Sequence, residues 1–208
     1  MFDPARTSQM TNQHAHNLLP LMTQRLVLRR LQDNDAPALA AYRNDPEVAR
    51  YQSWERCSLS EAKALISENR RQTFGAPGEW LQAAIALRTT NEAIGDIAMK
   101  LQRQDPRQAV IGYTVARPHQ RHGYAREIIN ALFGYFFGVM GLHRVSADCD
   151  PRNHASWGLM ESLGMRREAH HRQSLWFKGE WADEYIYAIL RQEWETRPER
   201  PEKPERKP

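Results

Sequence analysis

Short apolar stretches along the chain predict most of its strands. Leu26, Leu28 and Leu31 mark a first strand within residues 24–31. Five residues, 88–92, separate the next two apolar runs, as in a hairpin loop. The later predicted strands are residues 80–87, 93–101, 109–115, 143–150, 166–177 and 180–190. The chain is therefore expected to form a sheet of about seven strands.

Apolar residues spaced by three and four positions predict about four helices. The longest covers residues 124–139, where Ile128, Leu132 and Phe136 fall on one broad apolar face. The other predicted helices are residues 36–42, 58–71 and 153–163. We expect the helix over residues 36–42 to end near Pro46, because the residue before a proline disfavours helical backbone. Gly164 closes the last helix.

The order of these elements predicts an α/β fold. Hairpins join most neighbouring strands, so the sheet should be mixed and mainly antiparallel. The long helix connects the fourth strand to the fifth, which predicts one parallel pair with a right-handed crossover.

The two ends of the chain differ from the middle. Residues 1–22 are polar without a period, and residues 196–208 repeat proline every third or fourth position. We expect a flexible arm over residues 1–22, one domain over residues 23–191 and a flexible tail over residues 192–208. Neither a run of eighteen apolar residues nor a secretory leader pattern is present, and two cysteines predict no disulfide framework. These features favour a cytoplasmic protein that does not enter a membrane.

The charge balance is weakly informative. The 208 residues carry a formal net charge of +4. A basic balance would suit an anionic partner, but part of the excess lies in the proline-rich tail. No basic strand rich in aromatic residues supports a nucleic-acid partner.

One segment joins a strand, a glycine turn and a helix. The strand over residues 109–115 leads into Gln120-Arg121-His122-Gly123-Tyr124-Ala125, and the long helix follows. The first N–H groups of a helix have no partner within it and attract phosphate groups. Gly123 permits close approach, while Arg121 and Arg126 add positive charge. A plain strand–helix turn would show the same glycine, and the segment is neither a Walker loop nor a dinucleotide fingerprint.

The segment from Gln120 to Ala125 resembles the Q/R-x-x-G-x-G/A signature of the GNAT superfamily of acetyltransferases. The strand over residues 143–150, Asn153-His154-Ala155-Ser156 and Leu163-Gly164-Met165 fit the same family in order and spacing. Thr23-Gln24-Arg25-Leu26-Val27-Leu28-Arg29 resembles the opening strand of one branch. That branch acetylates N-terminal amines (alanine or serine) of ribosomal proteins and includes small-amine acetyltransferases. The resemblance covers residues 23–191 and implies a GNAT fold with the parallel pair splayed apart.

The resemblance implies that acetyl-coenzyme A is the cosubstrate and that no metal takes part. Its pantetheine arm would pair with the backbone of Tyr113, Val115 and Ala116. Its pyrophosphate would lie on the loop that includes Gln120 and on the amides of Arg121, His122, Gly123, Tyr124, Ala125 and Arg126. Asn153 would bond the arm from the far side, or serve only as a helix N-cap.

The resemblance also implies direct transfer to an amine. The N–H of Val115 or Ala116 would polarise the thioester. Many members place a tyrosine acid where this chain has Met160, which has no proton to give. Ser156 is expected to act instead, unless it serves only in the first helical turn. The general base stays open among Glu79, Asp96, Asp148, His119 and His122, or a water relay.

The acceptor is expected to be a primary amine, in first place a protein N-terminal α-amine. A polyamine, aminoglycoside or amino acid is the alternative within the enzymes. A catalytically silent coenzyme-binding module is the alternative outside them. Exposed strand edges and tryptophans near the end of the chain also permit a homodimer.

Overall fold

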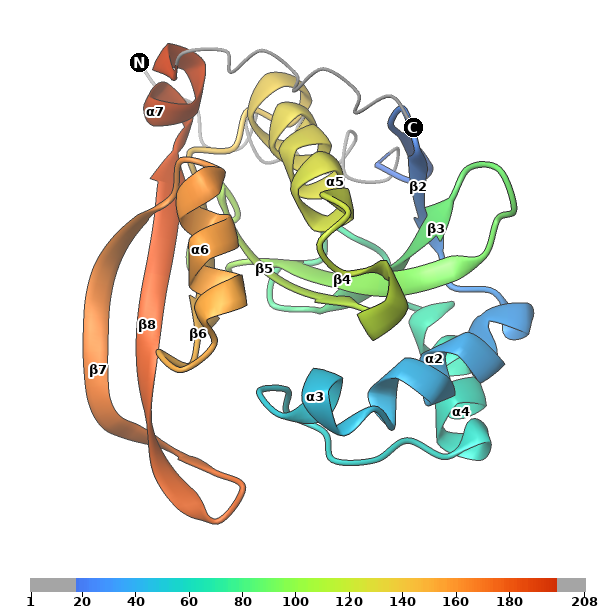
Figure 1. The fold of residues 1–208 in the computed structure, drawn as a ribbon. Helices are drawn as coiled ribbons and strands as arrows, with labels where there is room; N and C mark the ends of the chain where they lie inside the picture. The colour runs from blue at the N-terminus through green and yellow to red at the C-terminus, as the bar shows by residue number, and fades with distance from the viewer. Residues whose placement is uncertain (1–17, 198–208) are drawn as a thin grey trace, which may run out of the picture.

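A computed structural model describes residues 18–197, which form one mixed sheet of eight strands. The strands lie in the order β1-β2-β3-β4-β5-β6-β8-β7 (Figure 1). Their bounds are β1 Leu21–Met22, β2 Leu26–Arg30, β3 Leu81–Leu87, β4 Ala93–Leu101, β5 Gln108–Val115, β6 Arg144–Cys149, β7 Arg166–Phe177 and β8 Glu180–Leu190. The predicted α/β class and mainly antiparallel sheet are confirmed, with one strand more than expected.

The parallel pair lies where the sequence predicts it. Neighbouring strands are antiparallel except β5 and β6, which pair from Gln108 opposite Arg144 to Val110 opposite Ser146. β5 continues to Val115 without further pairing to β6. The sheet therefore opens along half of β5, and the opening divides β1–β5 from β6–β8.

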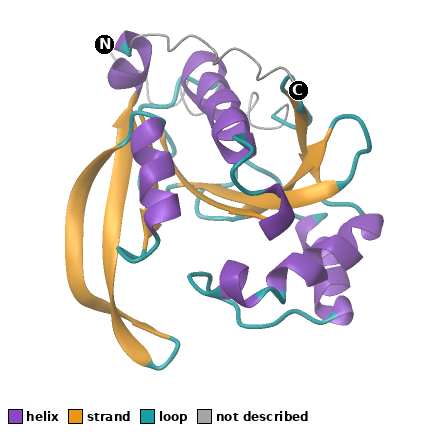
Figure 2. Ribbon diagram, viewed as in Figure 1, coloured by secondary structure: helices purple, strands orange, loops and turns teal. Residues whose placement is uncertain are grey.

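Helices cover both faces of the sheet. Their bounds are α2 Ala36–Arg43, α3 Pro46–Ala49, α4 Leu59–Asn69, α5 Tyr124–Phe133, α6 His154–Ser162 and α7 Arg191–Thr196, with short 3-10 turns at Asp33–Asp35 and Arg117–His119. The larger apolar core packs α5 and α6 on one face of the sheet. A smaller core packs α2 and α4 on the other face, below the sheet in Figures 1 and 2.

Two local features differ from the predicted helices. The predicted helix over residues 124–139 is an α-helix only to Phe133, and Gly134–Val139 form a π-helix in which the Met140 N–H donates to the Tyr135 C=O. Pro46 begins a helix, α3, instead of simply ending the previous one. The Asp45 side chain caps that helix, and proline suits the first helical position.

The first predicted domain boundary, after residue 22, lies at the end of β1, and the second, after residue 191, lies inside α7. β1 pairs with β2, and Leu18 is buried in the larger core. At the other end, α7 continues beyond β8, and its Trp194 ring lies 5.6 Å from the Phe137 ring. The remainder of the predicted arm and tail, residues 1–17 and 198–208, lies outside the described residues. Within residues 18–197, no helix is long and apolar enough to cross a membrane.

Candidate active site

The free half of β5 presents unpaired backbone groups to the opening in the sheet. Opposed residues of an antiparallel pair alternate between exchanging and not exchanging hydrogen bonds. The Ala116 N–H donates to the Ile94 C=O at 2.8 Å, so Thr114 also bonds to β4. Tyr113 and Val115 therefore direct their N–H and C=O groups away from β4, toward the opening. An extended ligand can add to this edge as a strand would.

The loop before α5 is closed onto the end of β5. The Gln120 side-chain N–H donates to the Val115 C=O at 2.9 Å. Arg121 has a φ of 62° and Gly123 a φ of 79°, both in the left-handed region. These two turns curl the chain so that α5 begins at Tyr124 with its first N–H groups at the end of β5. The loop and the free strand edge thus meet at one place.

A cleft of about 1260 Å³ extends from the start of α5 through the opening in the sheet. Ten of the predicted coenzyme residues line it: Tyr113, Val115, Gln120, Arg121, Gly123, Tyr124, Ala125, Arg126, Asn153 and Ser156. Sequence reasoning therefore selected residues that the fold brings together from β5, the loop, α5 and α6.

Two other predicted coenzyme residues do not line the cleft. The Ala116 N–H is bonded to β4, which leaves Val115 as the predicted donor that faces the opening. The His122 ring turns back on the loop, with Nδ1 2.7 Å from the Gln120 carbonyl oxygen, and stacks 5.6 Å from the Tyr124 ring. His122 therefore supports the loop from within.

Ser156 lies beside the free edge of β5. The Tyr113 hydroxyl lies 3.0 Å from Ser156 Oγ and 3.1 Å from the Ser156 carbonyl oxygen. Asn153 caps α6, because its carboxamide oxygen accepts the Ser156 N–H at 3.2 Å. Met160 is fully buried in the core. A hydroxyl group thus lies in the cleft, whereas the Met160 thioether packs away from it.

Carboxylates gather in the other half of the cleft. Side chains alternate between faces along a strand, so Asp148 of β6 and Glu184 of β8 lie on the face opposite α5 and α6. Removal from water in the cleft raises the pKa of both groups, and the Asp148 charge raises that of Glu184 further. The other carboxylates that line the cleft are Glu47, Glu55, Asp150 and Asp183. This half of the cleft therefore suits a cationic group.

The five residues proposed as general bases fall into two groups, those that line the cleft and those that lie away from it. Asp148 and His119 line the cleft, whereas Glu79, Asp96 and His122 do not. Asp96 is 2 % exposed and accepts hydrogen bonds from Tyr42 and Gln82, and burial raises its pKa. Glu184 was missed by sequence reasoning. Its alternation with Ala182 would have placed it on one face of β8, but only the pairing of β8 with β6 brings it near Asp148.

Two side chains join the two parts of the molecule at the carboxylate end of the cleft. The Lys178 ammonium, at the tip of the β7–β8 hairpin, donates to the Ala49 and Trp54 carbonyl oxygens at 2.8 and 2.9 Å. The Tyr51 hydroxyl donates to the Arg152 carbonyl oxygen at 3.2 Å. The hairpin tip and the segment after α3 therefore lie against each other and border the region where an acceptor would enter.

The fold and the loop before α5 define the class: an acyltransferase that takes its acyl group from a coenzyme A thioester. The chain belongs to the GNAT acetyltransferase family, since the family model described as "Acetyltransferase (GNAT) domain" matches residues 25–166. GNAT acetyltransferases use acetyl-coenzyme A. The predicted family and enzyme class are confirmed.

Known proteins resemble the chain, two of the three described below over more than four fifths of its length. It is 34% identical over 175 residues to the uncharacterized N-acetyltransferase YoaA of Bacillus subtilis. The aligned residues make up 82% of this chain and 96% of YoaA. It is 27% identical over 84 residues to the [Ribosomal protein uS5]-alanine N-acetyltransferase of Escherichia coli, 40% of this chain and 43% of that protein. A GNAT-family acetyltransferase from Bacillus anthracis superposes with a TM-score of 0.73 at 29% identity, over 83% of this chain and 98% of that one.

Proposed function

We propose that this protein transfers the acetyl group of acetyl-coenzyme A directly to a primary amine, in first place the α-amine of a protein N-terminus. One observation carries the proposal. The free edge of β5, the start of α5 and a cluster of carboxylates line the same cleft. The first two suit the coenzyme, and the third suits an amine.

The described residues fit the coenzyme in shape and charge. The backbone of Tyr113 is open to the amide groups of a pantetheine arm, which can pair as a strand does, whereas the Val115 C=O already accepts from Gln120. The first N–H groups of α5, with Arg121 and Arg126 beside them, suit a pyrophosphate. The Asn153 oxygen is used in its helix cap, so the ligand would meet its nitrogen. Within residues 18–197, no group of three potential metal ligands lies together.

The protein's part in the reaction follows from these positions. Acetyl-coenzyme A supplies an acetyl thioester. The Val115 N–H would donate to its carbonyl oxygen, where negative charge develops. Asp148 and Glu184 would hold the incoming ammonium group, and one of them would take its proton, for which their raised pKa values suit them. The free amine would then bond to the thioester carbon as the carbon–sulfur bond breaks. The departing thiolate would accept a hydrogen bond from Ser156 Oγ and gain the proton that the new amide nitrogen loses, a role that the thioether of Met160 cannot fill.

The α-amine is favoured over the lysine side chain by acidity. A free α-amine has a pKa of about 8 and a lysine amine about 10.4, so the α-amine loses its proton to a carboxylate more readily. The relative named as a uS5-alanine N-acetyltransferase acts on such a group by its name. A small polycationic amine is the second candidate: six carboxylates line the cleft, and two of them, Asp150 and Asp183, are paired with Arg152 and His170.

Calorimetry with acetyl-coenzyme A tests the first half of the proposal. We expect micromolar binding by the native protein and none by Gly123→Trp, because an indole at Gly123 would fill the approach to the start of α5. No binding by the native protein would refute the proposed enzyme.

An acceptor panel tests the second half. It compares one peptide with a free N-terminus, the same peptide blocked at its N-terminus but bearing a lysine, and a linear polyamine. Acetylation of the first alone supports the N-terminal substrate, whereas acetylation of the polyamine alone supports the second candidate.

A further inference from the structure

The segment that opens the domain is bonded to the first turn of α5, about a hundred residues later. The Thr23 hydroxyl donates to Glu127 Oε1 at 2.6 Å, and the Arg25 N–H donates to the same oxygen at 2.9 Å. Arg25 Nε donates to Glu127 Oε2 at 2.7 Å. Both carboxylate oxygens of Glu127 are therefore held by the turn between β1 and β2.

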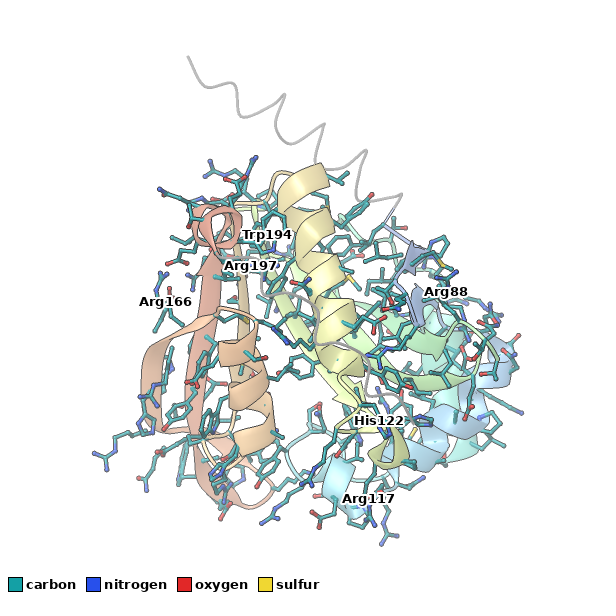
Figure 3. All side chains as sticks on the ribbon, turned by 45° about the horizontal axis from the view of Figure 1, so that its top comes forward. Arg88, Arg117, His122, Arg166, Trp194 and Arg197 are labelled. Carbon is teal, nitrogen blue, oxygen red and sulfur yellow. The ribbon has the colours of Figure 1, made fainter. Side chains whose placement is uncertain are left out.

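The Arg25 side chain continues past Glu127 onto the loop before α5. Its Nη1 donates to the His122 carbonyl oxygen at 3.1 Å, and its guanidinium carbon lies 4.6 Å from the centre of the Tyr124 ring. Its Nη2 lies 3.5 Å from the position that a β-carbon on Gly123 would occupy. Arg25 does not line the cleft. It packs behind the loop, against His122, Gly123 and Tyr124, and the last two of these residues line the cleft. Figure 3 labels His122 at the start of α5 and Arg88 near the edge of the sheet.

This loop needs support from its surroundings. Arg121 holds a left-handed backbone conformation although it has a β-carbon, and such a conformation persists only where neighbouring groups fix it. Glu127 also places a negative charge in the first turn of α5, where phosphates are expected. Arg25 offsets that charge from the side away from the cleft.

We propose that Arg25 is a positioning residue of the coenzyme site: by joining Glu127, His122 and Tyr124, it holds the loop in its phosphate-binding shape and neutralises the carboxylate beneath it. The proposal rests on the coenzyme site proposed above. It also assigns a physical task to Thr23 and Arg25 within the opening motif of the sequence.

The test compares Arg25→Ala with Arg88→Ala. Arg88 holds the same segment through the Thr23 and Gln24 carbonyl oxygens, at 2.8 and 3.3 Å, and its guanidinium is directed to these oxygens and not to the loop before α5. We expect Arg25→Ala to raise the Kd for coenzyme A and the KM for acetyl-coenzyme A about tenfold, as the loss of a charge-assisted hydrogen bond does. The kcat at saturating acetyl-coenzyme A should stay within about twofold, since Arg25 contacts no reacting group. Arg88→Ala should leave both the Kd and the KM unchanged.

Two further variants distinguish the loss of the Arg25 charge from a nonspecific loosening of the loop before α5. Arg25→Lys should recover part of the affinity, and adding Glu127→Gln to Arg25→Ala should recover part of it by removing the unpaired carboxylate. Amide hydrogen exchange over residues 120–126 should speed up in Arg25→Ala without bound coenzyme. An unchanged Kd in Arg25→Ala, or an equal rise in Arg88→Ala, would overturn the proposal while leaving the enzyme's function standing. Failure of the native protein to bind coenzyme A would overturn both.

Discussion

Gly95 offers the sharpest test of how β5 is held beside the opening in the sheet. Gly95 lies on β4 directly opposite Val115. A β-carbon there would lie 2.2 Å from the Thr114 carbonyl oxygen and 3.0 Å from the Val115 Cα. Carbon and oxygen normally approach to about 3.3 Å, so β5 would have to shift by roughly 1 Å. The neighbour is backbone, which has no rotamer by which to move aside.

The magnitude of Gly95→Ala follows from two effects. Overpacking a filled site costs about 1–3 kcal/mol, and loosening the hydrogen bond between Ala116 and Ile94 adds about 1 kcal/mol. We expect the free energy of unfolding to fall by about 3 kcal/mol, which lowers the Tm by about 6–12 °C in a protein of this size. Affinity for coenzyme A should fall as well, because Val115 moves with the strand.

Thermal unfolding with a matched glycine provides the assay. Gly158 lies within α6 with open space around its β-carbon position, so Gly158→Ala should leave the protein as stable or raise its stability by about 0.5–1 kcal/mol. A Tm for Gly95→Ala within about 2 °C of the native value would refute the reasoning, since it would show that β5 moves away from β4 at little cost.

Three more predictions concern the cleft. Ser156→Ala should lower kcat about a hundredfold with little change in the KM for acetyl-coenzyme A, and unchanged turnover would remove Ser156 from the chemistry. Asp148→Asn should lower the pKa of Glu184 by removing a like charge, so the acid-side fall in kcat/KM should move to lower pH; a pH–rate profile with no shift would argue against the pair. Burial raises the pKa of the Cys149 thiol to about 12, so iodoacetamide at pH 8 should label Cys149 only after unfolding, and rapid labelling of the folded protein by mass spectrometry would contradict this.

The sequence predicts those parts of the molecule that are set by local patterns. Strands and helices with a clear spacing, such as β2 and α5, lie close to where they were expected. The loop before α5 could be identified because all of its residues are consecutive. α3 was missed because it has four residues, and α7 because its six residues precede a proline-rich tail.

Contacts between distant segments could not be predicted in the same way. Glu184 meets Asp148 only because β8 pairs with β6, and Arg25 meets Glu127 only because the first strands lie beside α5. Val115 is distinguished from Ala116 by the register of β4 against β5, which no single strand reveals. These partners are a product of topology.

The opening in the sheet has a consequence for how the protein avoids aggregation. An exposed strand edge invites pairing with other chains and so promotes aggregation. The outer edges are protected, because β1 has two residues and β7 carries several arginines and two register shifts. The free edge of β5 lies instead inside the molecule, within a cleft bordered by β6 and α6. A narrow extended ligand can enter the cleft and reach this edge, whereas a strand within another folded protein is too bulky to do so. The protein thus has an open strand edge that lies out of reach of other folded proteins.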